Sequence, residues 1–170
     1  MTYDKLNETE KNKFISVCNS LPVNPDWLYK LIDFESRWNP LAKNPLSGAR
    51  GLIQFTNKTA RSMGYSSADD LVFKYPSIVS QLDIVYNYLK PYRPFPTEQS
   101  LTMAVFYPDF RYAEPDKAFP DTVTKDNPGI NTPADYMRLV FGQSFVPQAS
   151  IWIVVALVAG LLICKAKGWI

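Results

Sequence analysis

The sequence predicts a mainly α-helical domain, residues 1–145, joined to a C-terminal transmembrane helix, residues 146–170. Two observations predict this arrangement. Apolar residues recur at helical spacing between proline breaks, and the run 149–164 carries no charge before Lys165 and Lys167 follow. A chain of 170 residues is long enough for one domain and an appendage.

Capping residues and apolar periodicity place the helices of the first domain. Asn24 can cap a helix whose first position is Pro25, and Thr132 with Pro133 starts the last helix, which Gly142 ends. The expected helices are residues 8–20, 26–37, 56–64, one starting at 66 or 67, 76–89, 97–107 and 132–142.

Two segments between these helices read as irregular. Residues 39–56 are loop-like, with Leu52 and Ile53 as a short apolar piece that fits a strand. Residues 108–132 contain four prolines and no clear periodicity. Irregular segments of this length are usually functional or wrap the body of a domain.

The C-terminal run fits a single membrane anchor. Its sixteen uncharged residues, 149–164, span about 24 Å as a helix, and flanking residues can supply the rest of a bilayer core of about 30 Å. Trp152 and Trp169 bracket the run as interface residues do. By the positive-inside tendency, the lysine end faces the cytoplasm or the interior of a virus particle. A buried core helix is the alternative interpretation.

Composition excludes several functional classes. Histidine is absent, which excludes Ser-His-Asp and Cys-His mechanisms and the usual histidine metal sites, and no cofactor is implied. The 18 basic and 16 acidic residues nearly balance, so no strong field predicts nucleic-acid binding. The polar N-terminus lacks the apolar core of a signal peptide. The two cysteines, Cys18 and Cys164, are expected to stay unpaired.

Glu35 is the candidate catalytic residue. It continues a stripe of Leu28, Leu31 and Ile32 at helical spacing, and it lies in the last helical turn, where carbonyls present partial negative charge. Both features disfavour the ionised carboxylate and raise its pKa, as a general acid requires. The alternative is an ordinary last-turn glutamate that reaches solvent.

Two short motifs give Glu35 a context. Phe-Glu-Ser-Arg-Trp-Asn-Pro at 34–40 precedes Gly-Ala-Arg-Gly-Leu-Ile-Gln-Phe at 48–55. The pair resembles the goose-type-lysozyme-like lytic transglycosylases, whose motifs are Glu-Ser at a helix end and Gly-Leu-Met-Gln. The resemblance covers about residues 27–107 and implies a lysozyme-like α+β domain. The later segment 119–136 resembles forms of this enzyme carried by phages and viruses.

The resemblance implies a reaction and a role for each matched residue. Glu35 would protonate the glycosidic oxygen between N-acetylmuramic acid and N-acetylglucosamine, then act as base on the muramic 6-hydroxyl, which closes to a 1,6-anhydro product. Substrate binding would involve Ser36, Gly51, Leu52 and Gln54, with Ser36 and Gln54 positioning substrate or the glutamate through hydrogen bonds.

The third motif of the resembled family, Ala-Tyr-Asn, is altered in this chain. Residues 104–108 read Ala-Val-Phe-Tyr-Pro, so proline stands where asparagine would bind sugar. Tyr107 is the candidate for the hydroxyl that contacts Glu35 and for a substrate contact. The alternative is a tyrosine that packs in the core at the helix end.

One carboxylate favours transglycosylation over hydrolysis, because most glycosidases use two. Asp33 faces another side of the helix. Asp83 or Asp109 could fold back into the cleft as a second carboxylate, so a muramidase remains an alternative. A second alternative is an inactive membrane-anchored virion protein that kept a lysozyme-like fold.

The expected partners and location follow from these assignments. Partners are peptidoglycan glycan strands and a lipid membrane through residues 149–170, with other virion membrane or capsid proteins as candidates. The expected location is a virion membrane or the host cell envelope, for entry through the cell wall or exit from it.

Overall fold

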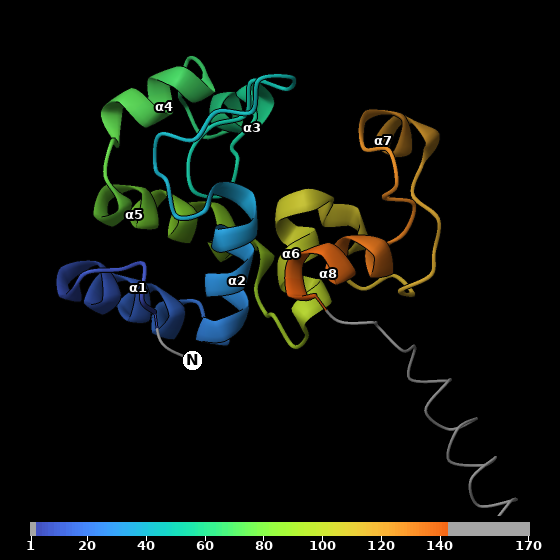
Figure 1. The fold of residues 1–170 in the computed structure, drawn as a ribbon, viewed down its shortest axis with the longest axis horizontal. Helices are drawn as coiled ribbons and strands as arrows, with labels where there is room; N and C mark the ends of the chain where they lie inside the picture. Colours follow the sequence, from blue (N-terminus) through green and yellow to red (C-terminus); the bar gives the residue numbers. More distant parts are fainter. Residues whose placement is uncertain (1–2, 143–170) are drawn as a thin grey trace, which may run out of the picture.

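The computed structural model describes residues 3–142, and this part of the chain is mainly helical (Figure 1). Its elements follow one another as α1 Glu8–Ser20, α2 Pro25–Ser36, α3 Asn57–Ser62, α4 Ala68–Lys74, α5 Ile78–Leu89, η1 Lys90–Tyr92, α6 Glu98–Phe106, η2 Pro108–Phe110, α7 Asp121–Asp126 and α8 Pro133–Phe141.

The transmembrane helix predicted at 146–170 lies outside the described residues. Within residues 3–142, no helix is both long and apolar enough to cross a membrane.

Helix starts agree with the capping residues read from the sequence. The side chain of Asn24 accepts from the amide of Asp26 at the start of α2, with Pro25 at the first helical position. Thr132 forms a capping box with Asp135 at the start of α8, which ends at Gly142 in the left-handed conformation. Local hydrogen bonding therefore fixes where these two helices begin.

Two expectations from the sequence are wrong. Leu52 and Ile53 form no strand but lie in a turn, and β pairing at this loop is limited to isolated bridges of Arg50 with Lys43 and with Phe55. The segment expected to be irregular contains a short helix, α7. Two or three residues of apolar sequence carry too little periodicity to separate a strand from a turn.

Helix α2 occupies the middle of the molecule (Figure 1). Helix α1 packs against α5 and α2, while α6 and α8 pack against α2 and against each other. Helices α3 and α4 lie beside the loop 39–56, and α7 extends beyond α6 and α8 (Figure 1). The end of α2 that carries Glu35 is thereby placed among elements from both halves of the sequence.

One hydrophobic core joins these helices. Leu82, Val85 and Leu89, on one face of α5, are all fully buried. Full burial of such a side chain stabilises the fold by about 1.5–3 kcal/mol. Cys18 also lies in the core, where burial raises the pKa of its thiol to about 12, so this thiol is unreactive.

Helix α2 ends abruptly after Glu35 and Ser36. Arg37 and Trp38 both take the left-handed conformation, with φ of 55° and 62°, which costs about 1–2 kcal/mol for each residue. Packing offsets this cost, because the buried Trp38 ring lies 5.3 Å from the Phe14 ring and 5.0 Å from the Tyr29 ring, between centroids. The aromatic anchor holds the last turn of α2, and with it Glu35, in place.

Candidate active site

Glu35 lies where the sequence predicts, in the last turn of α2. Leu28, Leu31 and Ile32 on the same face are fully buried, and the Glu35 side chain is half-buried rather than extended into solvent. The Tyr136 hydroxyl, from α8, donates a hydrogen bond to Glu35 Oε1. The contact therefore joins α2 and α8 through two residues that are 101 positions apart in the sequence.

Burial raises the pKa of Glu35 from 4.5 to about 7, although the hydrogen bond from Tyr136 acts in the opposite direction. Burial disfavours the charged form, while a donated hydrogen bond favours it. A carboxyl group with a pKa near neutral can both give and take a proton at that pH. Such a perturbed value is common at catalytic sites.

Aromatic rings surround the Tyr136–Glu35 contact. Tyr136 is buried, with its ring stacked on Phe106 at 4.2 Å between centroids and edge-on to Phe34 at 5.6 Å. Burial and the nearby charge of Glu35 raise the pKa of Tyr136 well above 10, so its hydroxyl keeps its proton and remains a donor. The two phenylalanine rings pack against the Tyr136 ring and hold it in place.

Tyr88 of α5 lies within range of the charge of Glu35. Burial, the neighbouring Tyr92 and the charge of Glu35 together raise the pKa of Tyr88. Its hydroxyl donates to the Ala104 carbonyl at 2.8 Å, and its ring is edge-on to Phe55 at 5.9 Å between centroids. Because Phe55 follows Gln54, Tyr88 connects the surroundings of Glu35 with the second predicted motif.

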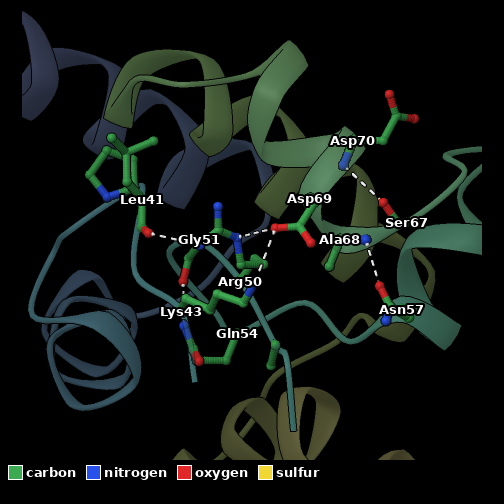
Figure 2. Close-up of polar contacts among 12 residues, drawn as sticks. Leu41, Lys43, Arg50, Gly51, Gln54, Asn57, Ser67, Ala68, Asp69 and Asp70 are labelled. Carbon is green, nitrogen blue, oxygen red and sulfur yellow. Dashed lines mark hydrogen bonds and ion pairs between the residues drawn. The ribbon is translucent and has the colours of Figure 1, made fainter. Parts of the chain in front are cut away.

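The loop 51–54 forms a tight turn. Gly51 has φ of 77° and Gln54 has φ of 53°, and the amide and side-chain nitrogens of Gln54 donate to the Gly51 carbonyl at 3.2 Å and 3.0 Å. Arg50 points to α4, where its Nε lies 2.9 Å from Asp69 Oδ1, and Lys43 reaches the same oxygen at 3.9 Å (Figure 2). The side chain of Gln54 is half-buried in this turn.

Leu52 was predicted as a substrate-binding residue, and in the structure it anchors the loop 51–54. Its side chain is fully buried in the core, and its amide donates to the side chain of Gln81 at 2.9 Å. An apolar side chain gains most by joining the core, so Leu52 holds the loop against the core. The roles of Gly51, Leu52 and Gln54 in substrate binding stay predictions.

Two other predicted contacts with Glu35 are absent from the described residues. The buried hydroxyl of Ser36 donates to the Ile32 carbonyl one turn back at 3.1 Å, and no hydrogen bond joins it to Glu35. Tyr107 packs its half-buried ring near Phe110 and Phe119, at 5.1 Å and 5.9 Å between centroids. Tyr136 supplies the hydroxyl expected from Tyr107. Substrate contacts by Ser36 and Tyr107 stay predictions.

No second carboxylate accompanies Glu35 within residues 3–142. None of the described aspartates or glutamates affects the pKa of Glu35. Asp33 pairs with Lys5 and Arg37 on the outer side of α2, and Asp83 pairs with Lys13 of α1. The exposed Asp109 forms no such pair among the described residues. The described part of the chain thus offers one acid at this site.

Sequence reasoning missed Tyr136. The periodicity of α8 places it on the inner face with Met137 and Val140, and a buried tyrosine hydroxyl usually has a hydrogen-bond partner. That rule indicates that the Tyr136 hydroxyl has a hydrogen-bond partner, but it does not indicate which residue of another helix the partner is.

We expect Tyr136→Phe to raise the pKa of Glu35 further and to slow glycan cleavage by about ten- to a hundredfold. The lost hydrogen bond favours the carboxylate form, whereas the packing against Phe34 and Phe106 is kept. The check is a pH–rate profile on purified peptidoglycan, in which the Glu35 limb should move to higher pH. An unchanged profile would show that the contact does not tune Glu35.

Comparison with known families gives a match in the first part of the domain. Residues 15–81 match the family model described as Transglycosylase SLT domain, and this family comprises lytic transglycosylases that act on peptidoglycan. The match spans Glu35 and the loop 51–54 and ends before Tyr136. No match was found among curated proteins or among solved structures. The prediction of an enzyme of the lytic transglycosylase class is confirmed, and an origin in a phage or virus stays a prediction.

Proposed function

We propose that this chain is a lytic transglycosylase that cleaves the β-1,4 linkage between N-acetylmuramic acid and N-acetylglucosamine with Glu35 as its acid and base. The observation that carries the proposal is the state of Glu35, a half-buried carboxyl group with a pKa raised to about 7 and a tyrosine hydroxyl bound to it. The match of residues 15–81 to the SLT domain supports peptidoglycan as the substrate.

The first step is proton transfer from Glu35 to the glycosidic oxygen. The bond from the muramic C1 to that oxygen breaks, and the N-acetylglucosamine leaves with the proton as a free hydroxyl. The positive charge that develops at C1 is shared with the acetamido oxygen of the same sugar. The hydrogen bond from Tyr136 stabilises the carboxylate that remains on Glu35.

The second step returns the proton to the enzyme. The Glu35 carboxylate takes the proton of the muramic 6-hydroxyl. The oxygen of that hydroxyl then attacks C1 to close the 1,6-anhydro ring. Glu35 is protonated again, so no water enters the products. A single carboxyl group suffices for both steps, in keeping with the absence of a second acid near Glu35 among the described residues.

A muramidase is the alternative for the same bond. Hydrolysis with inversion needs a second carboxylate to activate water from the opposite face, and hydrolysis with retention needs one as a nucleophile. The described aspartates that were candidates, Asp83 and Asp109, supply no such partner to Glu35. The proposal therefore favours transfer to the internal hydroxyl.

The products of the full 170-residue chain acting on purified peptidoglycan test the proposal. We expect mass spectrometry to find muropeptides with 1,6-anhydromuramic ends, each lighter by one water than the hydrolysed form. Reducing muramic ends would identify a muramidase. Intact glycan under all conditions would leave an inactive structural protein with a lysozyme-like fold.

The setting of the enzyme belongs to the proposal as well. We infer that residues 149–170 anchor the chain in a membrane, either of a virion or of the host envelope, and that cleavage serves passage through the cell wall. Support comes from the uncharged run 149–164, followed by Lys165 and Lys167.

A further inference from the structure

A buried glutamine ties three separate segments of the fold together. Gln81, near the start of α5, is fully buried, and its Oε1 accepts the Leu52 amide at 2.9 Å. Its Nε2 donates to the carbonyls of Pro40 at 2.6 Å and Tyr75 at 2.9 Å. Without the side chain, the buried Leu52 amide and the partly buried carbonyls of Pro40 and Tyr75 would lose these hydrogen bonds.

Two of the three segments belong to the candidate active site. Pro40 follows Glu35 by five residues in sequence, just after the turn that ends α2. Leu52 lies inside the loop 51–54, which carries Gln54. A single side chain thus connects the backbone that follows the catalytic helix with the backbone of the predicted substrate-binding loop.

The contact between Gln81 and this loop is tight. A Cβ atom on Gly51 would lie 2.6 Å from Gln81 Oε1, closer than real Cβ atoms come to other atoms. Because Gln81 is held by three hydrogen bonds, it cannot move aside cheaply. Glycine at position 51 therefore allows the side-chain amide of Gln81 to approach the loop, and it also allows the positive φ of 77°.

Resting on the proposed function, we propose that Gln81 is a positioning residue that fixes the loop 51–54 relative to Glu35 and thereby sets substrate binding. The position requires one acceptor and two donors on a single uncharged side chain, which is the capacity of a carboxamide. Leucine or methionine provides none of these bonds. Ionised glutamate would accept from Leu52 but would face the Pro40 and Tyr75 carbonyls without a donor.

The test compares Gln81→Met with a matched control, Gln99→Met, in the full chain. Methionine has nearly the shape of glutamine, so the packing is kept. Gln99 is also buried, and its Nε2 donates to the carbonyls of Phe110 at 3.3 Å and Ala113 at 2.7 Å, away from the loop 51–54. Both substitutions remove hydrogen bonds from a buried glutamine, but only one of the two glutamines holds the loop.

We expect Gln81→Met to raise KM for purified peptidoglycan by about tenfold or more, with a smaller change in kcat, and Gln99→Met to leave KM unchanged. Amide exchange followed by NMR should show faster exchange at Leu52 in Gln81→Met alone. Equal KM changes in the two variants, or full protection of the Leu52 amide in Gln81→Met, would overturn the assignment.

A second variant covers loss of folding in Gln81→Met. Gln81→Glu keeps an acceptor for Leu52 and loses the two donors, so KM should rise while the Leu52 amide stays protected. Normal KM in Gln81→Glu would overturn the link through Pro40. If the wild type releases no glycan, the proposed function fails, and Leu52 exchange alone decides whether Gln81 holds the loop.

Discussion

Glu35→Gln is expected to reduce the release of soluble fragments from purified peptidoglycan by about a thousandfold or more. The amide has nearly the shape of the carboxylic acid and can still accept from Tyr136, but it cannot give a proton to the glycosidic oxygen or take one from the 6-hydroxyl. The measurement is the initial rate of fragment release by the full chain at neutral pH.

Asp33→Asn is the matched control for this substitution. Asp33 lies two residues earlier on the same helix, and its carboxylate pairs with Lys5 and Arg37 on the outer side. Its loss should leave fragment release close to that of the wild type. Comparable activity in Glu35→Gln and wild type would remove Glu35 from the mechanism.

The thermal stability of Glu35→Gln also tests the raised pKa of Glu35. Because folding raises the pKa of Glu35 from 4.5 to about 7, the unfolded chain ionises at lower pH than the folded chain. The stability that protonated Glu35 contributes is complete below 4.5 and is lost as pH rises through about 7. As pH rises from 4.5 to about 7, the melting temperature of Glu35→Gln should therefore rise relative to that of the wild type.

Gly51→Ala is expected to destabilise the domain by about 1–3 kcal/mol more than Gly48→Ala. Both glycines have positive φ, 77° and 71°, so backbone strain of about 1–2 kcal/mol is common to the two substitutions. Only the Cβ at 51 meets another residue, Gln81 Oε1 at 2.6 Å, whereas nothing lies within 4 Å of the Cβ at 48.

Urea unfolding of the two glycine variants and the wild type measures this difference. Gly48→Ala provides the strain without the collision, so the excess loss in Gly51→Ala reports the fit between the loop and α5. Equal losses would mean that Gln81 yields to the added methyl group and that the loop is held less tightly than the contacts indicate.

Features that depend on neighbouring residues were predictable from the sequence. The start of α2 follows from Asn24 and Pro25, and the burial of Leu28, Leu31 and Ile32 follows from their spacing. The half-buried position of Glu35 is a consequence of the same periodicity, because a residue that continues an apolar stripe lies at the edge of the core.

Features that depend on distant residues were not predictable. The partner of Glu35 comes from α8, 101 residues away, and nothing near Tyr136 in sequence indicates which carboxyl group it meets. Gln81 reads as one polar residue at the start of an amphipathic helix, although it is fully buried. Leu52 was assigned to the substrate because its motif was known as a unit, whereas its side chain packs in the core.

The pKa of Glu35 is the quantity on which the catalytic account depends. Carboxyl-carbon NMR of the full chain, with the Glu35 resonance identified by its absence in Glu35→Gln, measures it directly. We predict a titration midpoint near 7, with the protonated form still present at pH 6. A midpoint at the ordinary value of 4.5 would mean that the carboxyl group is fully hydrated and would contradict its role as the proton donor.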